Sequence, residues 1–170
     1  MLASFRYAWI INLLIFQIGW FICVVGGSLW AVIFTVPILA FHVRFYPNGN
    51  KDVLAIVLML IIGLCHDNLL AVAGVLVFSD SNISPPWLWC LWLLLGMTLK
   101  HSLAWVYSRP WVAAIGGAVS GPLAYVAGVA LSDAQWGVPI MQASVIMAGV
   151  WLFILPLHRF LVHKVELLWH

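Results

Sequence analysis

Charged residues are scarce in this sequence. Lys, Arg, Asp and Glu make up 7% of its 170 residues, against about 25% in ordinary soluble domains. Hydrophobic residues make up 65%, and a chain of this length has too little interior to hide so much apolar surface from water. The composition therefore excludes a soluble globular domain and an intrinsically disordered chain.

Motifs for common soluble functions are also missing. The net charge is only +2 and no basic stripe occurs, so a nucleic-acid partner is not expected. Three cysteines form no Cys-x-x-Cys pair and no Cys/His ligand spacing, which argues against a disulfide scaffold. Ser102 and Ser120 lack the context of a catalytic nucleophile. The sequence indicates no cofactor.

Long apolar runs are what the sequence does contain. A helix that crosses about 30 Å of hydrocarbon needs about 20 apolar residues, and segments rich in Gly, Pro, Asn, Asp and Ser separate six such runs. The runs do not alternate with a period of two, which disfavours a barrel. We predict an all-α membrane protein, a single domain over residues 1–170, whose six spans cover about 7–25, 27–43, 53–78, 87–107, 111–131 and 138–157.

The first run could be mistaken for a signal peptide. Asn12 and Gln17 interrupt it, and the second run follows directly after Gly26-Gly27-Ser28. These features favour a retained span over a cleaved leader.

The basic residues predict the orientation of the spans. With six crossings, six of the seven Lys and Arg residues fall on one side, and the opposite loops carry Asp80 and Asp133. Because Lys and Arg are enriched on the cytoplasmic side, both termini are predicted to be cytoplasmic. The six residues are Arg6, Arg44, Lys51, Arg109, Arg159 and Lys164.

Two charged residues fall inside predicted spans. Asp67 lies about 16 Å from the outer end of span three, and Lys100 about 20 Å from the outer end of span four, at 1.5 Å per residue. A charge near the bilayer centre costs at least about 2.5–3.5 kcal/mol, so each is expected to face the protein and find a partner. Because their depths are similar, we predict an ion pair between Asp67 and Lys100. It either sets helix register or holds a ligand, an ion or a proton.

Other polar residues fall at comparable depth and complete a candidate substrate-binding set. Interhelical hydrogen bonding is the simpler explanation for the histidines, and a metal site of His66, Asp67 and His101 is the weaker alternative. The whole set is Asn12, Gln17, His66, Asp67, Asn68, Lys100, His101 and Tyr125.

The fifth run carries a pattern of small residues. Gly117 and Gly121 are four residues apart, so a neighbouring helix can approach their face closely, and Tyr125 follows on that face. Pro122 removes one helical hydrogen bond and predicts a kink. Gly117, Gly121, Pro122 and Gly128 are therefore predicted to serve helix packing, with a ligand cavity against this helix as the alternative.

Several of these motifs together resemble the bacterial inner-membrane family called domain of unknown function 2878. The resemblance covers nearly the whole chain and is carried by Asn12 with Phe16-Gln17-Ile18-Gly19-Trp20, Gly63 with Asp67, Pro86-Trp87-Leu88, His101-Ser102-Leu103, and Gly121-Pro122-Leu123-Ala124-Tyr125. It implies a multi-pass protein of the bacterial inner membrane and no assigned activity. A weaker likeness, in architecture only, connects the chain with the substrate-binding subunits of energy-coupling-factor vitamin transporters.

Three functions remain open at this point. Buried polar groups without a catalytic motif favour the binding or transport of a small molecule or lipid, with the lipid bilayer as surroundings and a homodimer or partner membrane subunit expected. The alternatives are an integral-membrane enzyme that acts on lipid through a His/Asp site, and a structural membrane scaffold subunit.

Overall fold

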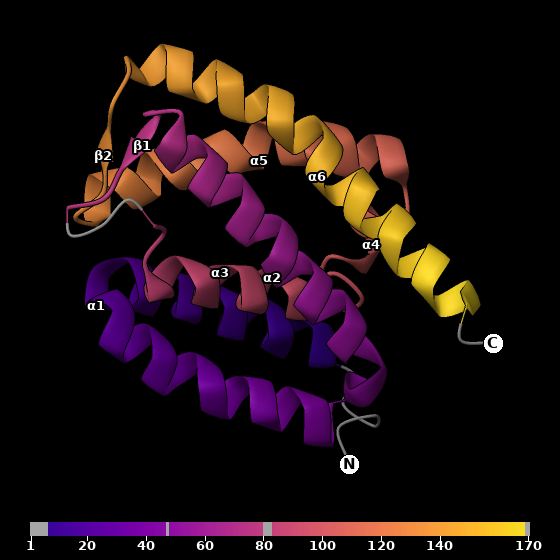
Figure 1. Ribbon diagram of the computed structural model, residues 1–170. Helices are drawn as coiled ribbons and strands as arrows, with labels where there is room; N and C mark the ends of the chain where they lie inside the picture. The colour runs from indigo at the N-terminus through magenta and orange to yellow at the C-terminus, as the bar shows by residue number, and fades with distance from the viewer. Residues whose placement is uncertain (1–6, 47, 80–82, 169–170) are drawn as a thin grey trace. The chain divides into compact units, whose positions relative to one another are not determined.

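The structure is a computed structural model that describes residues 7–46, 48–79 and 83–168 (Figure 1). These residues are helical except for turns and one pair of short strands, which confirms the predicted all-α class. Arg6 and Asp80, which entered the orientation argument, lie outside the described residues. The elements are α1 (Ala8–Phe45), α2 (Gly49–Val72), β1 (Leu76–Val77), α3 (Pro86–Thr98), α4 (Ala104–Tyr107), α5 (Pro110–Leu131), β2 (Gln135–Trp136) and α6 (Ile140–Leu168).

The chain divides into two compact units. Unit 1 comprises Met1–Ile61 and Pro86–Ala104, and unit 2 comprises Ile62–Pro85 and Trp105–His170. In unit 1 α3 packs on α1, and in unit 2 α5 packs on α6. Helix α2 contributes its first half to unit 1 and its second half to unit 2.

Helix α1 consists of two arms that fold back on each other (Figure 1). Gly27 separates the arms with φ 70° and ψ −172°, a conformation that glycine adopts without the steric cost of a Cβ. The hydroxyl of Tyr46, beyond the second arm, donates to the carbonyl of Ala8 at the start of the first. The turn predicted at Gly26-Gly27-Ser28 is thus confirmed.

The fourth predicted run is not one continuous helix. Helix α3 ends at Thr98, turns follow over 99–103, and α4 covers only 104–107, whereas one span over 87–107 was expected. Asn12 explains the break: its Oδ1 accepts hydrogen bonds from the Ser102 backbone N–H at 3.3 Å and the Ser102 Oγ at 2.6 Å. These bonds hold the polar 99–103 segment out of helical geometry.

The loops of unit 2 contain structure that the sequence did not predict. Gly74 ends α2 at φ 68°, and the Val75 N–H bonds to the Leu70 carbonyl, which together form a Schellman cap. Helix α2 therefore ends at Val72, six residues before the predicted limit of span three. The chain then forms β1, which pairs antiparallel with β2.

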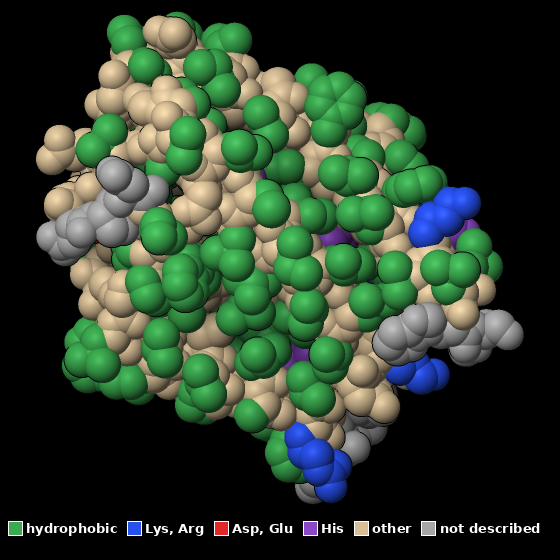
Figure 2. All heavy atoms as spheres, viewed as in Figure 1, with side chains coloured by type: hydrophobic (Ala, Val, Ile, Leu, Met, Phe, Trp, Pro, Cys, Tyr) green, Lys and Arg blue, Asp and Glu red, His purple; other side chains and the backbone are tan. Residues whose placement is uncertain are grey.

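Among the residues that the structure describes, four helices are long and apolar enough to cross a membrane: α1, α2, α5 and α6. Helix α3 is apolar but shorter, with 13 residues. Large hydrophobic side chains point outward along these helices, such as Leu29, Trp30 and Phe153, and Figure 2 shows such side chains covering much of the face in view. Outward apolar surface of this extent identifies an integral membrane protein.

Candidate functional site

A fully buried acid of unit 2 lies in a polar cluster of three side chains. Asp67 on α2 is 0% exposed, and its Oδ1 accepts a hydrogen bond from the hydroxyl of Tyr125 on α5. The His66 Nδ1 lies 2.8 Å from the same oxygen and 3.3 Å from the Tyr125 hydroxyl. We call these three residues the Asp67 cluster.

Small residues on α5 let α6 approach the Asp67 cluster. A Cβ at Gly117 would lie 2.7 Å from the Trp151 carbonyl oxygen, and a Cβ at Gly121 would lie 2.7 Å from Cε2 of its indole. The Trp151 ring centre therefore comes within 6.1 Å of the His66 ring and 6.4 Å of the Tyr125 ring. An indole thus walls the cluster on one side.

Two of the α5 glycines predicted to serve packing face Trp151 on α6. Gly117 and Gly121 are buried against Trp151, whereas a Cβ at Gly128 would meet no described atom within 4 Å. Pro122 is also buried, and α5 continues through it from Pro110 to Leu131.

The Asp67 cluster combines an acid, an imidazole and a phenol in an apolar environment. Such a group can exchange hydrogen bonds with a polar ligand, or move a proton among its members. Lys100, the partner expected for Asp67, belongs to unit 1, and that ion pair stays a prediction.

A second polar cluster lies at one end of unit 1. The Asp52 Oδ2, in the first turn of α2, is 3.1 Å from Nε2 of His42 in the last turn of α1. The same oxygen is 2.6 Å from Nε2 of His101, in the turn after α3. We call His42, Asp52 and His101 the Asp52 cluster.

Tyr46 closes one side of the Asp52 cluster. Its ring stacks on His42 with centres 4.9 Å apart and meets His101 edge-on at 4.6 Å. Burial raises the pKa of the Tyr46 phenol, so the hydroxyl keeps its proton and donates a hydrogen bond to the Ala8 carbonyl. The cluster therefore lies where the two ends of α1 meet the start of α2.

Sequence reasoning identified His101 and missed its two partners. Within unit 1 the His101 imidazole contacts Asp52, and its grouping with His66 and Asp67 of unit 2, the weaker alternative drawn from the sequence, stays a prediction. Among the described residues, the group of three candidate metal ligands is His42, Asp52 and His101. The sequence did contain a signal for this pair. His42 and Asp52 stand on either side of the short loop between two spans, so both lie near the same membrane surface.

Two predicted site residues are engaged with the chain itself. The Asn12 Nδ2 donates to the Met97 carbonyl at 3.1 Å, in addition to its bonds from Ser102. The Asn68 side chain donates to the Leu64 carbonyl at 2.8 Å and accepts from the Ser84 N–H at 2.9 Å. Gln17, by contrast, is exposed on the first arm of α1. Ligand contacts by Asn12, Gln17 and Asn68 stay predictions.

A further buried contact that the sequence did not indicate joins α4 to α6. The Tyr107 hydroxyl lies 2.9 Å from Nδ1 of His158, which is 0% exposed, and Arg159 donates to the Tyr107 carbonyl at 3.0 Å. The Arg159 guanidinium also bonds the Ser108 carbonyl. These bonds fasten α6 to the turn before α5.

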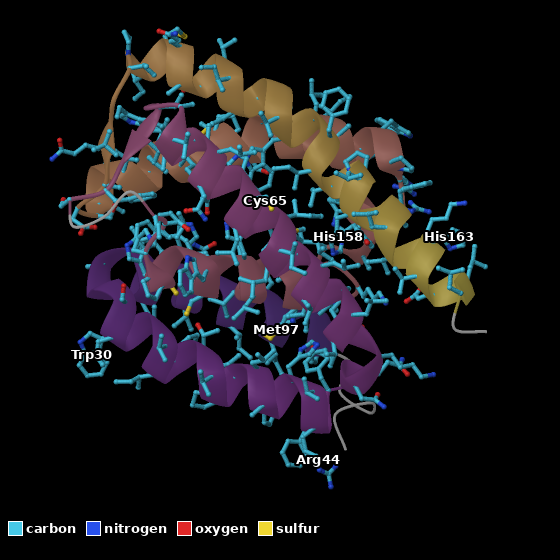
Figure 3. All side chains as sticks on the ribbon, in the orientation of Figure 1. Trp30, Arg44, Cys65, Met97, His158 and His163 are labelled. Atoms are coloured by element: carbon cyan, nitrogen blue, oxygen red, sulfur yellow. The ribbon has the colours of Figure 1, made fainter. Side chains whose placement is uncertain are left out.

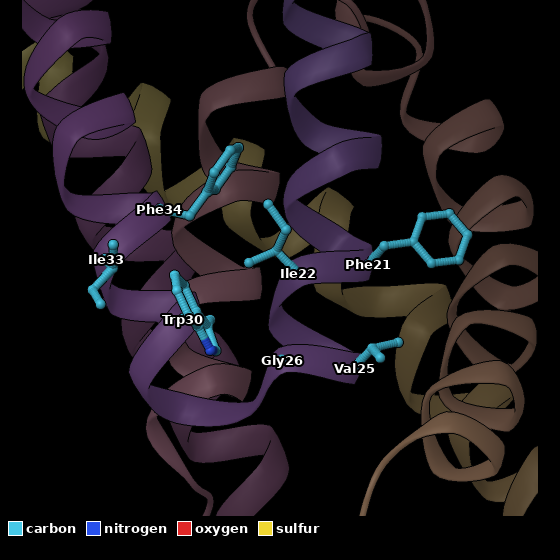
Figure 4. Close-up of a pocket in the computed structure, with 7 residues that line it drawn as sticks. All are labelled: Phe21, Ile22, Val25, Gly26, Trp30, Ile33 and Phe34. Atoms are coloured by element: carbon cyan, nitrogen blue, oxygen red, sulfur yellow. The ribbon is translucent and has the colours of Figure 1, made fainter.

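An apolar hollow lies between the arms of α1 near their bend (Figure 4). Its volume is about 630 Å³, and apart from the indole N–H of Trp30 its lining offers no polar side-chain atom. It suits hydrocarbon and provides no group for chemistry. The lining residues are Phe21, Ile22, Val25, Gly26, Trp30, Ile33 and Phe34.

Comparison with known proteins gives one match. A family profile described as "Protein of unknown function (DUF2878)" matches residues 9–157. No curated protein and no solved structure matches the chain.

Proposed function

The chain belongs to the family described as a protein of unknown function (DUF2878), and we propose that this integral membrane protein binds or transports a small molecule or lipid through a polar site among its helices. The single observation that carries the proposal is the complete burial of Asp67. Its carboxylate is 0% exposed, within a helix apolar enough to cross a membrane. A charge at membrane depth is costly, and such residues mark ligand, ion or proton sites.

The Asp67 cluster defines the class of ligand. A carboxylate accepts hydrogen bonds, while a phenol and an imidazole can each donate or accept. A ligand with a hydroxyl or amino group could replace the bond between Tyr125 and Asp67 without leaving the acid unsatisfied. Gln17, Lys100 and His101 belong to unit 1, and ligand contacts by these three residues stay predictions.

We place this protein in the bacterial inner membrane with six spans and both termini in the cytoplasm. The two arms of α1 supply two crossings, and the apolar α3 with its following turns supplies the fourth. The separation of Lys and Arg from the Asp133 side supports this orientation. A homodimer or a partner membrane subunit would complete a transporter of this small size.

Single-cysteine labelling in intact cells tests the orientation. In a chain freed of its native cysteines, Lys51→Cys and Asp133→Cys report opposite faces. An impermeant maleimide should label the second and spare the first until the membrane is opened. Labelling of both from outside, or the reverse pattern, contradicts the proposed arrangement.

Native mass spectrometry tests the binding function. The full chain is purified in mild detergent as the wild type and as Asp67→Asn. A bound small molecule or lipid should be present in the wild type and lost in the variant. Asp133→Asn is the matched control, because Asp133 is exposed and the change is identical. Equal ligand in all three forms, or none in any, contradicts the proposal.

The same samples separate the two alternatives. An enzyme acting on lipid predicts that added lipid changes mass with the wild type but not with Asp67→Asn. A scaffold subunit predicts no ligand and no conversion, with only a loss of thermal stability in Asp67→Asn.

A further inference from the structure

The Asp52 cluster brings together three metal-binding side chains from separate elements. One imidazole nitrogen each of His42 and His101 and one oxygen of Asp52 all lie within 4.8 Å of one another. The side chains of His42 and Asp52 are each 4% exposed and that of His101 is 13% exposed. All three residues belong to unit 1, so the cluster is complete within one compact part of the chain.

The separations are close to those that a bound ion requires. With tetrahedral Zn–N and Zn–O bonds of about 2.0–2.2 Å, neighbouring ligand atoms lie roughly 3.3–3.6 Å apart. The His42–Asp52 pair, at 3.1 Å, needs to open by a few tenths of an ångström, and the His101–Asp52 pair, at 2.6 Å, by about 1 Å. His101 can supply that movement because it lies in a turn and not in a helix.

We propose that His42, Asp52 and His101 bind one divalent transition-metal ion of the Zn²⁺ type. Two imidazoles and one carboxylate form a donor set that such ions favour over Mg²⁺ or Ca²⁺. Each imidazole coordinates through Nε2 and carries its remaining proton on Nδ1. Three protein ligands leave a fourth position for water or for a polar group of a ligand.

Neighbouring residues already hold the ligands in place. Tyr46 contacts both imidazole rings, and Asn12 bonds the ends of the turn that carries His101. Residues that orient metal ligands in this way reduce the entropy lost on binding. The ion would clamp the last turn of α1, the first turn of α2 and the turn after α3 together.

Metal titration of the full chain tests the proposal. The protein carries a purification tag without histidines and the change Cys65→Ser, because Cys65 is an exposed free thiol. After treatment with a chelator, calorimetric titration with Zn²⁺ should give one ion per chain. His101→Ala and His42→Ala should each weaken binding by more than the roughly 10- to 100-fold expected from losing a residue that only orients a ligand.

His163→Ala is the matched control, because His163 is an exposed histidine on α6 that does not belong to the cluster (Figure 3). It should leave Zn²⁺ binding unchanged. If Zn²⁺ fails to bind the wild type, or binds His101→Ala as tightly, the cluster is only a hydrogen-bonded triad and the proposal is overturned. Equal weakening by His163→Ala would likewise overturn it.

A second variant separates loss of a ligand from loss of folding. His101→Cys replaces one ligand atom with another, so Co²⁺ should bind and show a sulfur-to-metal charge-transfer band that the Cys65→Ser parent lacks. The absence of that band in a variant that elutes as a folded protein contradicts the proposed coordination. Because the Asp67 cluster does not take part, failure here leaves the test of ligand binding with Asp67→Asn unaffected.

Discussion

The Asn12 Oδ1 accepts a hydrogen bond from the Ser102 hydroxyl at 2.6 Å across 90 residues of sequence. The same side chain donates to the Met97 carbonyl, so one buried amide bonds both ends of the turn that carries Lys100 and His101. Asn12, which the sequence suggested for substrate contact, thereby holds the backbone that carries His101 of the Asp52 cluster.

Asn12→Ala should destabilise the protein by about 2–4 kcal/mol, because three hydrogen bonds are lost and buried groups of Met97 and Ser102 are left without Asn12. The midpoint of thermal unfolding in mild detergent measures the effect. Gln17→Ala is the control, because Gln17 is an exposed amide on the same arm. Similar losses in both variants would show that the Asn12 bonds contribute little.

Gly121→Ala should destabilise unit 2 by about 1–3 kcal/mol, because the new methyl group overlaps the Trp151 indole and forces it to move. Gly128→Ala on the same helix meets no described atom within 4 Å. It should be neutral or stabilising by up to about 1 kcal/mol, since alanine favours a helix over glycine. Thermal unfolding of the two variants side by side checks this, and the opposite order would contradict the packing described.

Tyr125→Phe should cost about 1–3 kcal/mol, because it removes a hydrogen-bond donor from a carboxylate that has no access to solvent. The free energy of unfolding measures it, with Tyr7→Phe as control, since the Tyr7 side chain is 58% exposed. Combining Tyr125→Phe with Asp67→Asn should be less than additive, because both changes remove the same bond. Strict additivity would mean that the two groups do not interact.

A second double-mutant cycle tests the ion pair expected between Asp67 and Lys100. If the two residues pair as the sequence predicts, losing either partner leaves the other charge uncompensated within the membrane, so Asp67→Asn and Lys100→Leu should each lower stability and the double variant should recover part of it. If stability recovers but ligand binding does not, the pair serves function. If the single changes cost nothing, the pairing prediction is wrong.

The composition alone was sufficient to predict a membrane-embedded helical protein. Hydrophobic content of 65% and runs of about 20 apolar residues leave few other solutions, since backbone groups in lipid must bond within their own segment. The bend at Gly27 was also predictable, because glycine adopts this conformation without help from distant residues. The spacing of Gly117 and Gly121 predicted a close helix contact but not its partner, Trp151.

The partners of the polar side chains were decided only by the tertiary structure. Asp67 was matched with Lys100 by depth, yet the bonds described here come from Tyr125 and from its own neighbour His66. The sequence did not indicate that His101 contacts Asp52 and His42, a contact that depends on the turn after α3. Helix rise gives the depth of a residue but not the direction in which its side chain points. That direction depends on where each helix ends and which face it buries, and distant residues such as Asn12 and Trp151 determine both.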